Sequence, residues 1–158
     1  MKRDLNLLAV LFLFFYLVCT LFSADTDQKR PLGVPEDARF FGGKWYKVYS
    51  GHISWHNARD KCVVLGGRLA NVPDERTQAF IVGLADGKTL WLGATDEKMK
   101  GQWVWSDGST MKFKAWNDNH PLEMRGFDYL WIIRDGRWND APDKDSGGVG
   151  FICEWEKK

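Results

Sequence analysis

Apolar residues follow three different patterns along this chain of 158 residues. An almost unbroken apolar run extends from Leu7 to Phe22, near the N-terminus. In the middle of the chain apolar residues recur at three- and four-residue steps, whereas beyond Leu90 they form short runs separated by turn residues. Steps of three and four residues are typical of helices, and short apolar runs are typical of strands. The order of these two patterns therefore predicts helices first and strands later.

Two helices are predicted from the apolar spacing. The first follows Ser54, a good N-cap residue, and the glycine pair at 66–67 can end it in a left-handed conformation. Its apolar stripe consists of Trp55, Ala58, Cys62 and Leu65. The second is predicted to begin at Pro73, with acidic residues at 74–75 in its first turn, and to end at the Asp-Gly pair 86–87. Its stripe consists of Thr77, Phe80, Ile81 and Leu84.

Strands are predicted from the alternation at residues 44–50, where Tyr46 and Val48 share one face, and from the short apolar runs after Leu90. These runs cover residues 90–94, 103–105, 130–134 and 149–155, with Asp-Gly turns at 107–108 and 135–136. Helices followed by antiparallel strands make an α+β domain.

Residues 107–128 fit neither pattern, because they are rich in Gly, Asn, Asp and Lys. Loops of about twenty residues in a compact domain are usually functional or disordered. Apolar residues within the segment can pin it to a core and therefore favour an ordered loop. These residues are Phe113, Trp116, Pro121 and Phe127.

The N-terminal segment predicts export. Lys2 and Arg3 precede the apolar run, which at roughly 16 residues is shorter than the ~20 that a membrane-spanning helix needs. We therefore expect a signal peptide over residues 1–24, although cleavage at its end would place a bulky phenylalanine where a small residue is preferred. An uncleaved membrane anchor is one alternative, and lipidation of Cys19 is another.

The rest of the chain is predicted to be a flexible leader followed by one domain. Residues 25–39 are charged, contain two prolines and lack an apolar period, whereas residues 40–158 suffice for a single core. The chain carries 22 basic and 21 acidic residues, so no net field attracts a phosphate backbone, and we expect no nucleic-acid partner. After the export segment the cysteines are Cys62 and Cys153, and a single disulfide is the simplest interpretation in an oxidising compartment.

The sequence resembles the C-type lectin-like family across residues 40–155, in the order of several motifs. These are residues 55–62 followed by GGRLA at 66–70, WLGA at 91–94, GQWVW at 101–105 with an Asp-Gly pair at 107–108, WND at 138–140 and FICE at 151–154. They are similar, in turn, to the family's first helix, its central strand, the hairpin before its long loop and its closing strands.

The resemblance implies an α+β fold in which the chain ends meet, two helices flank two small antiparallel sheets, and a long loop presents the ligand site. It also implies that Cys62 pairs with Cys153 and ties the first helix to the last strand. The family's second disulfide is missing, because its two positions read Tyr129 and Asp143. The loop is therefore expected to be less constrained, with Tyr129 packing where the bridge would lie.

Sugar-binding members of the family hold a calcium ion with a Glu-Pro-Asn or Gln-Pro-Asp triplet and an Asn-Asp pair. Here the triplet at 120–122 reads His-Pro-Leu and a further acidic position reads Phe127, so most of the oxygen ligands of calcium are missing. Asn139 and Asp140 remain and, with Glu123 as a substitute, are the candidate metal ligands. The alternative interpretation is that Asn139 and Asp140 cap a turn.

The predicted ligand-binding residues are His120, Glu123, Trp131, Asn139 and Asp140. They predict lectin-like carbohydrate binding through the long loop, in a secreted or otherwise extracytoplasmic protein, with calcium as a possible cofactor. The alternative is a protein ligand bound without calcium. Contact with a membrane is expected only if the N-terminal segment is uncleaved.

Two further chemistries have less support. Zinc suits His120, Asp118 and Asp140 by residue type, but nothing in their spacing requires a metal. Asp140, Asp143 and Asp145 are close enough in sequence for glycoside hydrolysis, but the last two alternate with polar residues, as a solvated turn does. The sequence has no Ser-His-Asp order, phosphate loop or helical His-Glu-x-x-His motif, so we do not expect an enzyme.

Overall fold

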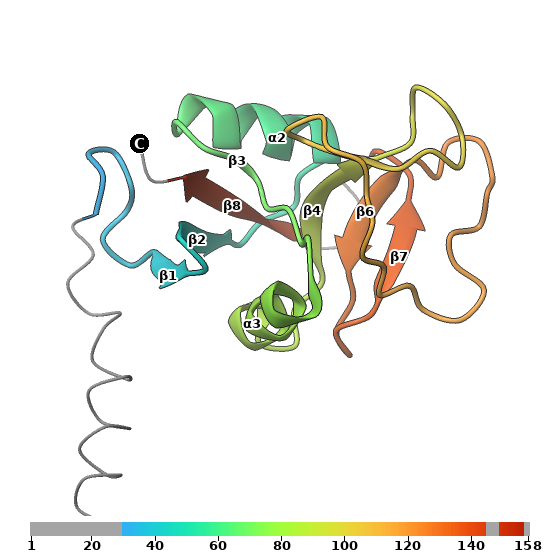
Figure 1. Ribbon diagram of the computed structural model, residues 1–158. Helices are drawn as coiled ribbons and strands as arrows, with labels where there is room; N and C mark the ends of the chain where they lie inside the picture. Colours follow the sequence, from blue (N-terminus) through green and yellow to red (C-terminus); the bar gives the residue numbers. More distant parts are fainter. Residues whose placement is uncertain (1–29, 145–148, 157–158) are drawn as a thin grey trace, which may run out of the picture. The chain divides into compact units, whose positions relative to one another are not determined.

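The computed structural model describes residues 30–144 and 149–156, which lie almost entirely in one compact unit, Pro31–Lys158 (Figure 1). The predicted signal peptide over residues 1–24, Cys19 and Asp145 lie outside the described residues, and so do residues 25–29 of the predicted leader. Within the described residues no helix has the length and apolar character needed to cross a membrane.

The strands form one eight-stranded sheet, in the order β1-β2-β8-β4-β6-β7, with β3 beside β8 and β5 beside β4. Their bounds are β1 Arg39–Phe41, β2 Lys44–Tyr49, β3 Arg68–Leu69, β4 Leu90–Thr95, β5 Val104–Trp105, β6 Tyr129–Ile132, β7 Trp138–Ala141 and β8 Gly150–Glu156. All pairings are antiparallel except that of β4 with β8, where Leu90 pairs with Gly150 and Trp91 with Phe151. The two antiparallel sheets that were expected are therefore two halves of one mixed sheet, joined at this parallel contact.

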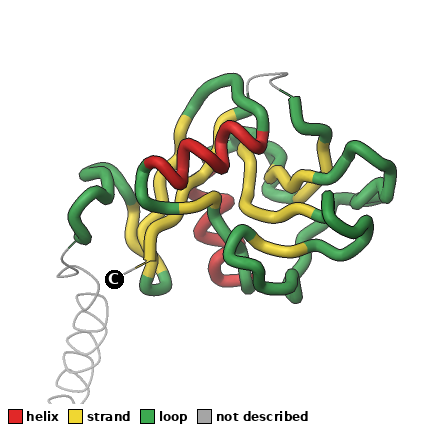
Figure 2. Tube along the Cα trace, turned by 90° about the horizontal axis from the view of Figure 1, so that it is seen from above, coloured by secondary structure: helices red, strands yellow, loops and turns green. Residues whose placement is uncertain are grey.

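Two helices cover opposite faces of the sheet, as Figures 1 and 2 show. Helix α2, Trp55–Val64, begins as predicted, because the Ser54 side chain accepts a hydrogen bond from the Asn57 backbone. Helix α3, Glu75–Ala85, begins two residues later than predicted, because Asp74 is its N-cap and accepts from the Thr77 backbone. Both predicted helices are confirmed.

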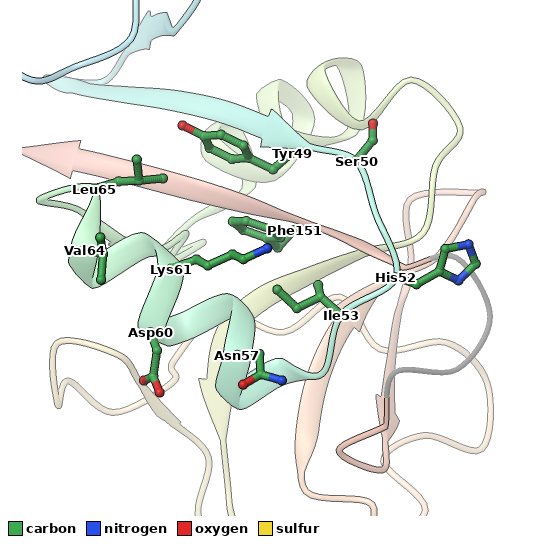
Figure 3. Close-up of a pocket in the computed structure, with 10 residues that line it drawn as sticks. All are labelled: Tyr49, Ser50, His52, Ile53, Asn57, Asp60, Lys61, Val64, Leu65 and Phe151. Atoms are coloured by element: carbon green, nitrogen blue, oxygen red, sulfur yellow. The ribbon is translucent and has the colours of Figure 1, made fainter.

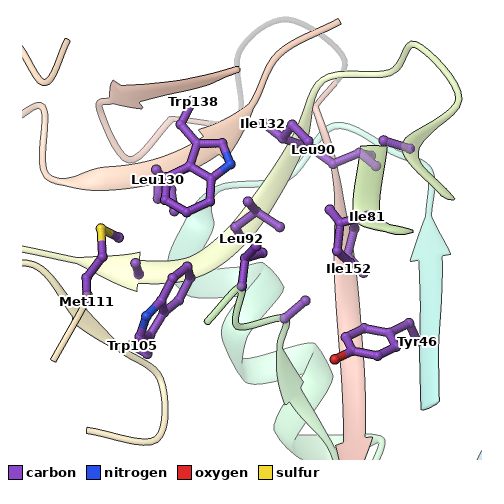
Figure 4. Packing of buried hydrophobic residues seen from close by; sticks show 14 of the residues in the cluster. Tyr46, Ile81, Leu90, Leu92, Trp105, Met111, Leu130, Ile132, Trp138 and Ile152 are labelled. Atoms are coloured by element: carbon purple, nitrogen blue, oxygen red, sulfur yellow. The ribbon is translucent and has the colours of Figure 1, made fainter. Parts of the chain in front are cut away.

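Each face of the sheet has its own apolar core. Alternate residues of each strand point to opposite faces, which separates the two sets. The core on the α3 side includes Ile81, Leu92, Leu130, Ile132, Trp138 and Ile152 (Figure 4). The core on the α2 side includes Trp55, Ala58, Trp91, Tyr129, Phe151 and Trp155.

A disulfide joins Cys62 of α2 to Cys153 of β8, with their Cα atoms 5.6 Å apart. The predicted pairing is confirmed, and both cysteines are fully buried. The staple fixes the first helix on the half of the sheet that contains β2, β3 and β8.

The folded part begins before Phe40, where the sequence pattern placed the domain boundary. Strand β1 starts at Arg39, and Val34 and Ala38 are buried in the core on the α2 side. Their backbone amides donate to the carbonyls of Pro31 and Pro35, so the prolines shape turns here. Apolar burial at two isolated positions leaves no period in the sequence, which explains the difference from the expected flexible leader.

Candidate functional site

The long loop between β5 and β6 is ordered by aromatic anchors, as its sequence predicted. The Trp116 ring lies 4.9 Å from that of Trp103, and the Phe113 ring lies 5.6 Å from that of Trp138, measured between centroids. Two backbone hydrogen bonds add to this packing, because Asn117 N donates to Trp138 O and Trp138 N donates to Ala115 O. The first half of the loop is thus fixed against β7.

Asp140 of β7 holds the second half of the loop. Its Oδ1 lies 2.6 Å from His120 Nδ1, and the Leu122 backbone amide donates to Oδ1 at 3.0 Å and to Oδ2 at 2.9 Å. The Asp140 side chain is fully buried, and 15% of the His120 side chain is exposed. Both carboxylate oxygens therefore bind the loop of the same chain.

Asn139 and Trp131 lie on the other face of the sheet. Neighbouring residues of a strand point to opposite sides, so Asn139 faces away from Asp140. Asn139 is the cross-strand partner of Trp131, whose ring stacks on Trp91 with centroids 5.1 Å apart. Within the described part of the chain, neither Asn139 Oδ1 nor Trp131 Nε1 has a hydrogen-bond partner, although both atoms are buried.

The five predicted site residues are thus not one constellation. His120 contacts Asp140 on one face of the sheet, and Trp131 lies beside Asn139 on the other face. Glu123 is exposed on the loop with a φ of 54°. Trp131 is half-buried and stacked, so it offers no free ring face comparable to an exposed aromatic residue. The sequence pattern grouped these residues by type and by nearness along the chain.

The residues that are present do not fit a calcium ion in this arrangement. Calcium takes six to eight oxygen ligands. Both Asp140 oxygens bind the loop, and Asn139 points to the other face. Among the residues that the structure describes, no group of three or more His, Cys, Asp or Glu side chains is arranged to hold a metal ion. Asp118, the third zinc candidate, is 92% exposed and lies 3.5 Å from Arg137.

Lys100 makes a second tether, which the sequence analysis did not identify. Its ammonium group donates to Asp96 Oδ1 at 3.3 Å, to Asp128 Oδ1 at 3.2 Å and to Phe127 O at 2.7 Å. The Asp96 side chain is almost fully buried and also accepts from the Gly101 backbone. The tether fixes the end of the long loop to the turn after β4. The sequence carried a signal for this tether, because an acidic residue follows a buried strand and a lysine lies four residues later.

A hydrogen-bonded network connects Tyr129 and Asp143, the two positions at which the resemblance implies that a second disulfide is missing. His56 Nδ1 lies 2.6 Å from Asp143 Oδ2, His56 Nε2 lies 3.3 Å from Glu97 Oε2, and Tyr129 Oη donates to Glu97 Oε2 at 2.7 Å. The Tyr129 ring also packs against Trp55, with centroids 5.0 Å apart.

The hydrogen-bonded network formed by His56, Asp143, Glu97 and Tyr129 changes the pKa of two of its residues. Burial raises the pKa of Tyr129 well above its ordinary value of 10.0, and the hydrogen bond to Glu97 raises it further. Burial also raises the pKa of Asp143, but hydrogen bonds from His56 outweigh burial and hold it below the ordinary 3.8. Asp143 therefore stays ionised beside His56, and its carboxylate is engaged in contacts within the fold.

A family model described as "Lectin C-type domain" matches residues 52–155 of this chain. The chain is 34% identical over 108 residues to the low affinity immunoglobulin epsilon Fc receptor of Mus musculus, a match that covers 68% of this chain and 33% of the receptor. It is 29% identical over 114 residues to the galactose-specific lectin nattectin of Thalassophryne nattereri, covering 68% and 72% respectively. The chain therefore spans about a third of the receptor's length and about seven tenths of nattectin's.

Among solved structures, the mouse scavenger receptor C-type lectin carbohydrate-recognition domain superposes with a TM-score of 0.72 and 27% identity. The match covers 78% of this chain and 97% of that one. Proteins of this kind are recognition modules rather than enzymes, and the contacts of Asp140 and Asp143 agree with that assignment. Sequence motifs, fold and comparisons lead to one conclusion: the chain belongs to the C-type lectin domain family.

Proposed function

We propose that this domain recognises a ligand outside the cytoplasm through its long loop and does so without calcium at Asp140. The observation that carries the proposal is that both oxygens of the buried Asp140 carboxylate already bind His120 and Leu122. A cation at this carboxylate would have to compete with both groups. An extracytoplasmic location is supported by the Cys62–Cys153 disulfide, because such bonds persist in oxidising compartments.

A protein is the ligand class that the loop surface favours. Leu122 and Met124, beside the Asp140 tether, are 37% and 55% exposed, and exposed basic residues Lys112, Lys114 and Arg125 lie in the same loop. Methionine and arginine are enriched at protein interfaces, and methionine adapts its shape to different partners. Exposed Asp118 and Glu123 lie in the loop as well, so apolar residues flanked by charges of both signs suit a partly apolar protein surface of mixed charge.

Carbohydrate binding is the second candidate function. It is supported by the 29% identity to nattectin, which is named as galactose-specific. In the ordinary family geometry the sugar is bound through calcium, and the contacts of Asp140 oppose that geometry here. A sugar would therefore have to bind by hydrogen bonds and stacking alone.

Calcium titration tests whether the domain needs calcium to bind its ligand. Thermal stability and glycan-array binding are measured with added calcium and with EDTA, and we expect both to be the same in the two conditions. A ligand present at a hundred times its dissociation constant should stabilise the protein by about 2.7 kcal/mol, so a calcium site would be visible. A calcium-dependent rise in both would overturn the proposal.

The protein ligand is sought on an array of extracellular protein domains in the presence of EDTA. We expect binding that Leu122→Asp and Met124→Asp each weaken by about tenfold, because each substitution places a carboxylate within an apolar contact. Met99→Asp is the matched control, since Met99 is 58% exposed and lies outside the loop. Equal loss in the control variant would place the binding surface elsewhere.

A further inference from the structure

A hollow lies on the half of the sheet that is stapled by the disulfide, beside α2 and the β2–β8 pair (Figure 3). Its volume is about 640 Å³, within the range of roughly 300–1,000 Å³ that is usual for small-molecule sites. None of the residues that line it belongs to the long loop or to the tethers described above. We refer to it as the α2 groove.

The floor of the α2 groove is aromatic and its wall is aliphatic. Tyr49 and Phe151 are cross-strand partners whose rings stack, with centroids 5.0 Å apart and planes 11° apart. Ile53 continues the floor, and Val64 and Leu65 of α2 form the wall. Val64 is 87% exposed and Leu65 is 37% exposed. These two side chains add little to the core and leave an apolar surface open to water beside the partly exposed Tyr49 ring, whereas Phe151 is 3% exposed and supports that ring by stacking.

The charge at the groove is positive. Figure 3 shows Lys61 extending from α2 toward the strand pair, whereas Asp60 points away from it. Asp60 forms an ion pair with Arg59 at 2.8 Å. Lys61 has no ion pair with any carboxylate in residues 30–144 and 149–156. Asn57 and His52 add hydrogen-bonding groups at the rim. Among the described residues, a cation without an ion-pair partner therefore lies next to the aromatic floor.

We propose that the α2 groove binds an amphipathic organic anion, with a flat apolar body against the Tyr49 ring and the aliphatic wall and its anionic group at Lys61. The disulfide supports this role, because Cys62 follows Lys61 directly and Cys153 lies two residues beyond Phe151. The two backbone segments that carry Lys61 and the floor are thus fixed relative to each other before any ligand arrives, which lowers the entropic cost of binding. The site is independent of the long loop and of its ligand.

The test uses two probes of similar shape, 2-naphthoate and its neutral analogue 2-naphthalenemethanol, titrated calorimetrically into the exported, oxidised protein. We expect 2-naphthoate to bind with a dissociation constant below about 1 mM and more tightly than the alcohol. Lys61→Gln should weaken the binding of 2-naphthoate by about fivefold, as expected for an exposed charge pair, and should leave the binding of the alcohol unchanged. Lys98→Gln, at an exposed lysine in the turn after β4, is the matched control and should change neither.

Val64→Asp should weaken the binding of both probes by about tenfold, because it removes part of the apolar wall. For 2-naphthoate it also adds a negative charge that repels the anion. Val64 is largely exposed, so the variant should fold; its thermal unfolding is compared with that of the parent, and Leu65→Asn replaces it if it does not. Failure of either probe to bind at millimolar concentration, or binding that Val64→Asp leaves intact, overturns the proposal. Self-association of the parent that Val64→Asp abolishes also overturns it, because a second copy of the chain would then cover the groove.

Discussion

His56 Nδ1 lies 2.6 Å from Asp143 Oδ2, and the His56 backbone amide donates to the other oxygen of the same carboxylate at 3.2 Å. The N-terminus of α2 is thereby joined to the segment after β7. Through Glu97 and Tyr129 the contact continues to the turn after β4 and to β6. A polar network thus links four segments that no covalent bond joins within the described residues.

Low pH should weaken the contact between Asp143 and His56. The pKa of Asp143 is lower in the folded protein than the ordinary 3.8, so the carboxylate stabilises the fold above that pH, and the stabilisation disappears as the pH falls through the folded pKa. Asp143→Asn should lower the free energy of unfolding by about 1 kcal/mol at neutral pH. Urea unfolding at several pH values should show the difference from the parent shrinking below about pH 4. Asp118→Asn, at a 92% exposed side chain, is the control and should show no such pH dependence.

Removing the Asp140 carboxylate should release the loop. Asp140→Ala leaves the Leu122 amide and the His120 ring without their partner, which should cost about 2 kcal/mol of unfolding free energy. Amide hydrogen exchange at Leu122 should become faster, and neither effect should depend on calcium. Slow exchange retained at Leu122 in the variant would show that the aromatic anchors alone hold the loop.

Lys100→Met should destabilise the protein more than an ordinary surface substitution. It leaves the buried carboxylate of Asp96 without its cation, at an expected cost of about 3 kcal/mol. Chemical unfolding measures the cost, and hydrogen exchange around Asp128 reports the loss of the tether. Lys98→Met, two residues earlier and exposed, is the matched control. Equal stability of the two variants would mean that the Lys100 contacts contribute nothing in solution.

The double variant Cys62→Ala with Cys153→Ala should lose about 4 to 5 kcal/mol, the chain-entropy value for a closed loop of this length. The two cysteines are 91 residues apart in sequence. Urea unfolding of the parent in reducing buffer should give a loss of similar size. A parent that is unaffected by reductant would show that the bond adds little to stability.

The helices were predictable because their signals are local. Ser54, the stripe through Trp55, Ala58 and Cys62, and the glycines after them all lie within one short segment. Strands β1 and β3 gave no recognisable pattern, since they comprise only three and two residues. For β7 the residue pattern alone gave no strand, because Asn139 and Asp140 are rare in strands; it was indicated only by resemblance.

The candidate site was harder to predict than the fold. Once residues 138–141 are a strand, alternation places Asn139 and Asp140 on opposite faces, and this consequence could have been drawn from the sequence. The contact of His56 with Asp143 could not, because the two residues are 87 positions apart and neither belongs to a pattern that names the other. The groove at α2 likewise depends on side chains from three separate segments.

The covalent staple and the polar tethers act on different halves of the sheet. Cys62 and Cys153 secure the half near the chain ends, whereas the loop-bearing half is held by hydrogen bonds, ion pairs and aromatic packing. A reductant therefore acts directly on the stapled half, whereas a change of pH reaches carboxylates in both halves, since buried Glu154 of β8 accepts from Lys44 and Arg68. Redox conditions and pH thus act on this small domain through different groups.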